Sequence, residues 1–118
     1  MACPYFRPLR ETAWSEGRAP LGGIFEGECT RGGTCDPRLC NFGYARGVCA
    51  HFPLDAVADV VRFSMLGGDR LVWILERDHT PVEHGVLEMK DGEPIGTMDD
   101  PMDSQALMFV DAYMRRRA

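Results

Sequence analysis

No run of apolar residues in this 118-residue sequence approaches the roughly 20 that a membrane-spanning helix requires. The N-terminal residues 1–7 lack the basic segment and the apolar segment that together mark a signal peptide. Basic residues are also few, with 13 Lys and Arg against 18 Asp and Glu. The formal charge of −5 argues against nucleic acid or an anionic membrane as the main partner. We therefore expect a soluble, cytoplasmic protein.

Several motifs that carry chemistry are missing as well. The sequence contains no glycine-rich phosphate loop, no dinucleotide-binding fingerprint, no serine-nucleophile motif and no C-x2-C pair. What is present is typical of a globular protein, because 45% of the residues are apolar and 26% are charged. A chain of 118 residues has room for one domain, so we expect residues 1–118 to form one.

Cysteine is absent after residue 49, and all five cysteines lie in the N-terminal part of the chain: Cys3, Cys29, Cys35, Cys40 and Cys49. Residues 1–53 also hold 13 glycines and prolines and keep neither a helical nor a strand period for long. Such a segment loses much chain entropy on folding and buries little apolar area. We expect an irregular, cysteine-rich arm that needs a bound metal or a cross-link to be ordered.

The remaining residues, 54–118, show regular patterns. β-Branched and aromatic runs predict antiparallel strands, and Gly67-Gly68-Asp69 predicts the turn between the first two. Residues 54–61 have the spacing of a short helix, although strand onset competes for the same positions. The expected strands are 60–66, 71–77, 83–89 and a short fourth at 94–98.

The C-terminal residues predict a helix. Asp100 is a plausible N-cap, Pro101 fits the first helical position, and Asp103 suits the positive end of the helix dipole. The apolar face consists of Ala106, Leu107, Val110, Tyr113 and Met114. The expected fold class is α+β: a cysteine-rich arm stapled by a metal site, then a three- to four-stranded antiparallel sheet with this helix packed on it.

Three roles compete for the cysteines. An odd number and the missing export signal argue against a disulfide framework. Unrelated buried thiols fit poorly, because the cysteines cluster in a segment that is poor in Leu, Val and Ile. A metal site would supply the stabilisation that the arm lacks, since metal-binding energy can act as folding energy. We therefore favour metal binding.

The spacing of the cysteines bears on the kind of metal. Structural zinc usually takes ligands two to four residues apart on two tight turns, and only Cys35 and Cys40 approach that pattern. The ligands of an iron–sulfur cluster can come from separate loops, and apolar cover limits their contact with solvent. Aromatic residues follow Cys3, Cys40 and Cys49 closely. We therefore expect a [4Fe–4S] cluster, with zinc as the alternative.

Four ligands are needed and five cysteines are present. Cys35 lies in a polar turn without aromatic cover, so we interpret it as a bystander or a nearby redox-active thiol. Cys3 lies so near the terminus that it would fray unless something held it. The predicted metal ligands are Cys3, Cys29, Cys40 and Cys49.

Three neighbouring polar residues are further candidates. Tyr44 and Arg46 lie between two predicted ligands and could donate hydrogen bonds to thiolate sulfur. The alternative is loop packing, with the guanidinium paired to a carboxylate elsewhere. His51 could replace a thiolate in a mixed site, but we favour a histidine at the surface or beside the ligands.

The segment Glu76–Gly85 concentrates three acids, one arginine and two histidines. A catalytic interpretation would use His79 or His84 as a general base, held by a neighbouring carboxylate. Their spacing matches no motif with a known mechanism. We favour a solvated polar connection between two strands, interrupted by Pro81, and no enzymatic role.

The sequence thus predicts a small iron–sulfur protein that serves electron transfer, redox sensing or the stabilisation of a docking surface. Such a role implies a protein partner for redox exchange or docking. The alternative is a zinc-stapled protein-interaction module without redox activity. An enzyme built around His79 and His84 is a third hypothesis.

Overall fold

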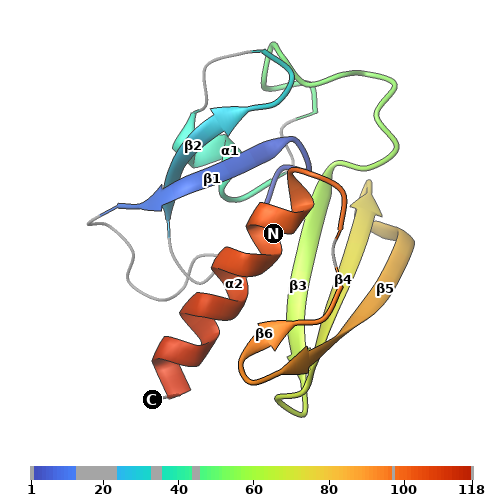
Figure 1. Ribbon diagram of the computed structural model, residues 1–118. Coiled ribbons are helices and arrows are strands. Elements are labelled where there is room, and N and C mark those ends of the chain that lie inside the picture. The colour runs from blue at the N-terminus through green and yellow to red at the C-terminus, as the bar shows by residue number, and fades with distance from the viewer. Residues whose placement is uncertain (1, 13–23, 33–35, 44–45, 97, 118) are drawn as a thin grey trace.

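The computed structural model describes residues 2–12, 24–32, 36–43, 46–96 and 98–117 (Figure 1). They form two antiparallel sheets and a long C-terminal helix, so the α+β prediction is confirmed. The first sheet pairs β1 (Phe6–Glu11) with β2 (Phe25–Cys29). The second consists of β3 (Val60–Leu66), β4 (Arg70–Arg77), β5 (Thr80–Lys90) and β6 (Glu93–Pro94). The helices are α1 (Pro37–Cys40) and α2 (Met102–Arg117).

The second sheet is a meander in the order β3-β4-β5-β6. Gly67 and Gly68 turn β3 into β4 with positive φ angles of 67° and 82°, a conformation that glycine adopts at no steric cost. The strands β3 and β4 therefore lie where the sequence predicts them, to within one residue. The fourth strand, β6, has only two residues and is much shorter than the expected 94–98.

The polar connection predicted over residues 76–85 is exposed at residues 77–84, as expected, but it is much shorter than predicted because β4 and β5 form a tight hairpin there. Asp78 and His79 make the turn with φ angles of 51° and 66°, and β5 begins directly at Thr80. Pro81 does not interrupt the strand. It lies opposite Glu76, where the register shifts, and irregular pairing of this kind tolerates a residue without an N–H. The side chain of Glu76 is buried rather than solvated.

One face of the second sheet carries the alternate β4 residues Leu71, Trp73 and Leu75. Leu71 is fully buried and packs with Ala106 and Val110 of α2. The indole of Trp73 lies against Gly85 on β5, where a Cβ atom would come within 2.5 Å of the ring. Trp73 therefore lies flat against its neighbouring strand because residue 85 has no side chain.

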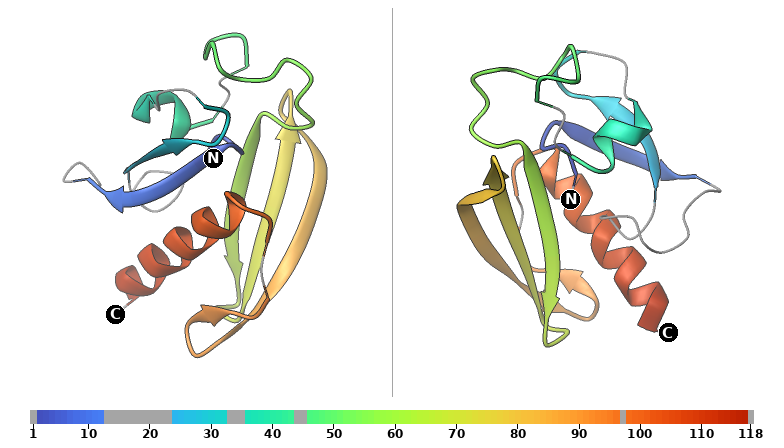
Figure 2. Two further views of the ribbon diagram at one scale, coloured as in Figure 1. Left: turned by 45° about the horizontal axis from the view of Figure 1, so that its top comes forward. Right: turned by 180° about the vertical axis from the view of Figure 1, so that it is seen from behind.

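Helix α2 packs against this inner face of the second sheet, and its other side contacts β1 (Figure 2). Ala106 and Val110 are buried as predicted, but Leu107 is half exposed and lies off the packed face. The helix begins at Met102, one residue later than expected. Asp100 does not cap it through its side chain, because the carboxylate accepts hydrogen bonds from the Arg7 guanidinium instead.

The N-terminal arm is less irregular than predicted, because residues 6–11 and 25–29 pair as strands. Phe6 and Phe25 are buried between this sheet and its neighbours. Asn41 binds the backbone of Phe25 at both ends, accepting from its N–H at 2.9 Å and donating to its carbonyl at 3.0 Å. The Asn41 side chain therefore bonds the backbone of β2 as a third strand would.

The short helix considered for residues 54–61 does not form. The chain makes turns and bends through residues 51–58, and Leu54 and Val57 are largely exposed. Ala56 and Ala58 are buried in their place. The apolar spacing predicted a helix wrongly, because the large apolar residues of this segment point away from the core and the small ones point into it.

The N-terminal segment 2–6 joins the two sheets. Ala2 exchanges two backbone hydrogen bonds with Val61 of β3, at 2.9 and 2.8 Å. The side-chain amide of Gln105, buried on α2, donates to the carbonyls of Cys3 and Phe6 at 2.8 and 2.7 Å. The first residues of the chain therefore contact the second sheet and α2 directly.

Substitution of Gly27 tests how closely β1 packs on β2. A Cβ atom at this position would lie 2.1 Å from the Arg7 carbonyl oxygen and 2.7 Å from the Phe6 ring. We expect Gly27→Ala to lower the free energy of unfolding by more than about 2 kcal/mol, because β1 must move away. Urea denaturation followed by circular dichroism measures this.

Gly32→Ala is the matched control. Gly32 has a positive φ of 87° but nothing within 4 Å of its added Cβ, so only the backbone penalty of about 1 kcal/mol is expected. Equal losses for the two variants would show that the close approach of β1 and β2 is incorrect.

Candidate metal centre

Four cysteines from separate parts of the chain line one pocket. Cys3 precedes β1, Cys29 ends β2, Cys40 ends α1 and Cys49 lies in the loop that leads to β3. We call this the cysteine pocket. Its cavity volume is about 10 Å³, room for about one water molecule, and its other lining residues are Tyr5, Arg31, His51 and Phe52. The four cysteines predicted as ligands are therefore brought together.

Backbone hydrogen bonds hold the cysteine-bearing segments in place. The Cys3 N–H donates to the Cys40 carbonyl at 2.9 Å, which joins the N-terminus to α1. Cys29 pairs with Phe6 across the first sheet, and the Phe52 N–H donates to the Cys49 carbonyl at 3.2 Å. Each cysteine thus lies at the end of an element or in a turn, where the next residues are free to change direction.

The environment of the pocket keeps its deepest thiol neutral. Cys3 and Cys40 are buried, whereas Cys29 and Cys49 are partly exposed. Burial raises the pKa of Cys3 to about 12, and its three neighbouring cysteines add to the rise, although a hydrogen bond with the Tyr5 backbone opposes it. A metal is the usual means of holding several thiolates together in such a place, because its charge offsets theirs.

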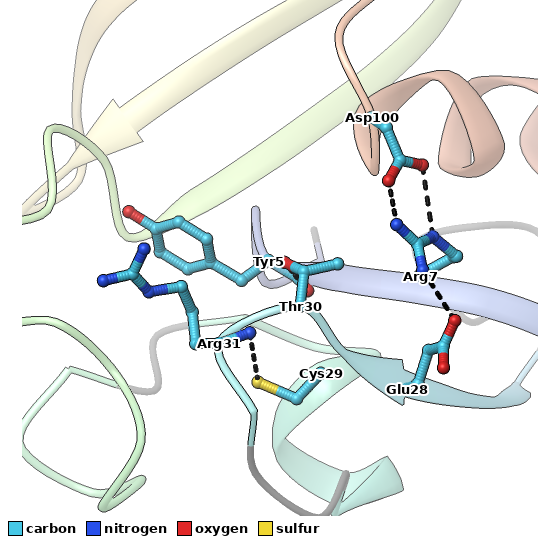
Figure 3. Close-up of polar contacts among 7 residues, drawn as sticks. All are labelled: Tyr5, Arg7, Glu28, Cys29, Thr30, Arg31 and Asp100. Atoms are coloured by element: carbon cyan, nitrogen blue, oxygen red, sulfur yellow. Dashed lines mark hydrogen bonds and ion pairs between the residues drawn. The ribbon is translucent and has the colours of Figure 1, made fainter.

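The Arg31 backbone supports one of these sulfurs. Its N–H donates to Cys29 Sγ at 3.4 Å (Figure 3). Hydrogen bonds of this kind stabilise a thiolate and tune a bound cluster. The sequence points to Tyr44 and Arg46 for this role and not to Arg31. The signal for it was the Gly32-Gly33 pair, which marks a turn directly after Cys29, and Gly32 has a positive φ of 87°.

Two aromatic side chains cover the pocket. They are Tyr5 and Phe52, which follow Cys3 and Cys49 in the sequence, as predicted. Tyr5 and Phe52 meet edge to face, with ring centroids 5.6 Å apart and planes at 74°. The guanidinium of Arg31 lies over the Tyr5 ring, and that of Arg46 lies over the Phe52 ring, each at 5.5 Å. Phe42, by contrast, is 41% exposed and does not line the pocket.

Arg46 braces the loop around Cys49 rather than donating to a thiolate. Its guanidinium hydrogen-bonds the carboxylate of Asp59 and the carbonyls of Leu54 and Ala56, the latter at 2.7 Å. This is the carboxylate pairing that the sequence analysis weighed as the alternative. Asp59 is buried and also accepts from the Asp78 N–H at 2.7 Å, which ties the loop to the β4–β5 hairpin.

Two other candidate residues, Cys35 and Tyr44, lie outside the described residues, so their predicted roles stay predictions. His51 lines the cysteine pocket from its exposed side. His79 and His84 are exposed, in the β4–β5 turn and on β5, and neither lines the cysteine pocket.

Among the described residues, no three His, Cys, Asp or Glu side chains form a group that could hold one metal ion. Ligands of a single zinc ion each lie about 2.3 Å from it, and therefore within about 4 Å of one another. The four cysteines line one pocket without forming a group of this kind.

Comparison with known proteins gives no family for this chain. No protein-family model matches it, and no curated protein and no solved structure is significantly similar to it. In the part of the chain that the structure describes, no helix is long and apolar enough to cross a membrane.

The Arg46–Asp59 pair predicts an acid-dependent loss of stability. Burial raises the pKa of Asp59, but the Asp78 N–H and the Arg46 guanidinium outweigh it and hold that pKa below its ordinary value. The stabilisation is therefore complete above the unfolded-state pKa of about 3.9 and is lost as the pH falls through the lower folded-state value.

We expect Asp59→Asn to lose about 1–3 kcal/mol of unfolding free energy at pH 7 and to show a weaker decline in acid than the unaltered protein. Urea denaturation between pH 7 and pH 2 measures both effects. Asp69→Asn is the control. It removes the carboxylate of an ion pair whose two side chains are both exposed, with Arg70 at 3.8 Å. If both variants keep full stability at pH 7, Asp59 does not hold the loop.

Proposed function

We propose that this chain is a small cytoplasmic iron–sulfur protein whose [4Fe–4S] cluster is bound by Cys3, Cys29, Cys40 and Cys49. The observation that carries the proposal is the convergence of these four cysteines on one pocket, from segments up to 46 positions apart in the sequence. The other predicted feature beside them is apolar cover, which Tyr5 and Phe52 supply.

A cluster suits the pocket better than a single ion does. In a four-iron cluster each thiolate binds a different iron, so the sulfurs lie farther apart than they do around one zinc. The described residues form no group that could hold a single ion. The described residues that line the pocket include no carboxylate, and thiolates are the usual ligands of iron–sulfur clusters.

The position of the pocket favours exchange with a protein partner. Cys29 and Cys49 are partly exposed, and Arg31 and His51 at the edge of the pocket are exposed. A cluster held there would lie near the surface, within reach of a docked protein. We propose electron transfer or redox sensing as its role, with a structural role if the cluster proves to be redox-inert.

Zinc remains the alternative because His51 lines the same pocket. Three thiolates and one imidazole are a common donor set for structural zinc. In that case the chain would be an interaction module without redox chemistry, and the loop bearing Cys49 and His51 would have to close on the other cysteines.

Metal analysis of protein purified without oxygen separates the two. The cluster predicts brown protein with about four iron and four sulfide per chain, whereas zinc predicts colourless protein with one zinc. Protein that contains neither metal, in a folded state and after anaerobic reconstitution with iron and sulfide, would contradict both.

Serine variants test the ligand assignment. We expect Cys3→Ser, Cys29→Ser, Cys40→Ser and Cys49→Ser each to lower the iron content strongly, because a hydroxyl is a poor substitute for thiolate. Cys35→Ser and His51→Ala are the controls and should keep the iron of the unaltered protein. A colourless Cys35→Ser variant beside a fully loaded variant of one predicted ligand would show that the assignment is wrong.

A further inference from the structure

A second cavity adjoins the cysteine pocket and shares the side chains of Tyr5 and Arg31 with it. We call it the junction groove, since its walls come from the first sheet, the end of β4, and the residues before α2. Its volume is about 490 Å³, within the usual range of about 300–1,000 Å³ for small-molecule sites. The residues that matter for its chemistry are Arg31, Val57, Leu75, Asp99 and Met102.

The junction groove contains two charges of opposite sign that have no counter-ion. Within the described part of the chain, the Arg31 guanidinium contacts only the Tyr5 ring, and the Asp99 carboxylate makes no ion pair or side-chain hydrogen bond. Asp100, which also lines the groove, is different because Arg7 binds its carboxylate and that of Glu28 (Figure 3).

The groove lining also includes apolar side chains. Val57 lies at its wall with 73% of its surface exposed, and Leu75 and Met102 line it as well. The groove thus holds an exposed valine, an unpaired cation and an unpaired anion. This combination favours an occupant that carries both charges and an apolar body. Such an occupant would cover Val57 and give each charge its counter-ion.

We propose that the junction groove binds a small zwitterion of the amino acid or dipeptide class with an apolar side chain. Its carboxylate binds the Arg31 guanidinium, which offers a planar pair of donors to such a group. Its ammonium binds the Asp99 carboxylate, and its side chain packs on Val57 and Leu75. The site goes beyond the proposed metal centre and needs only the folded chain, although Arg31 places the ligand beside the cysteine pocket.

Calorimetric titration with charged and capped ligands tests the proposal. The probes are leucine and leucyl-leucine, each compared with its N-acetyl form and its C-terminal amide. We expect at least one free zwitterion to bind, and each of its capped forms to bind at least about tenfold more weakly, since each loses one charge contact. Metal content is measured on the same samples, so a missing cluster and a missing ligand site are seen separately.

Two variants assign the two ends of the ligand. Arg31→Gln should weaken binding of the zwitterion but not of the amide, whereas Asp99→Asn should weaken binding of the zwitterion but not of the acetyl form. Arg70→Gln and Asp69→Asn remove the same charges at the β3–β4 turn, away from the groove, and should change nothing. The proposal is overturned if no zwitterion binds, if capped and free forms bind equally, or if the control variants weaken binding as much.

Discussion

The N-terminal segment 2–6 is the constraint on which the rest of this structure depends. Ala2 pairs with Val61 of β3, Cys3 bonds the backbone of Cys40, and Gln105 of α2 binds the carbonyls of Cys3 and Phe6. The second sheet, α1 and α2 therefore all meet a few residues at the start of the chain. Ala2, Cys3 and Phe6 are nearly inaccessible to solvent, so each hydrogen bond that they lose would leave a buried polar group unpaired.

The same segment supplies the deepest cysteine of the pocket, and this joins the proposed metal centre to the core. Cys3 and Cys40 belong to one buried cluster with Phe6, Phe25 and Val61. Without metal, Cys3 stays a neutral thiol and contributes as a small apolar side chain. With metal, the pocket would tie the N-terminus, β2, α1 and the following loop to one point, and binding energy would add to the stability of that joint.

The sequence allowed β3 and β4 to be predicted well, because β-branched and aromatic runs mark these strands and Gly67-Gly68 marks their turn. The β4–β5 turn was missed because Asp78 and His79 adopt positive φ without a glycine to signal it. Pairing of β1 with β2 was missed as well. Pro8 and Gly27 weaken the strand pattern there, and the need for Gly27 becomes visible only when Phe6 lies beside it.

The candidate site was likewise predicted in part from the sequence. Cys3, Cys29, Cys40 and Cys49 line one pocket, but Cys35 lies outside the described residues, so the choice of these four as ligands stays a prediction. The roles of Arg46 and Arg31 did not follow from the sequence, because the partner of a guanidinium depends on contacts across the chain. Arg46 pairs with Asp59, 13 positions away, and the Arg31 backbone reaches a sulfur that only the turn after β2 brings near.

Amide hydrogen exchange, measured on metal-loaded protein and again after removal of the metal with a chelator under anaerobic conditions, tests the central claim most directly. If the metal completes the joint at the cysteine pocket, the amides of residues 3–6, 25–29 and 40 lose protection when it is removed, while those of β3, β4 and β5 keep most of theirs. Equal protection of all these amides with and without metal would contradict the account.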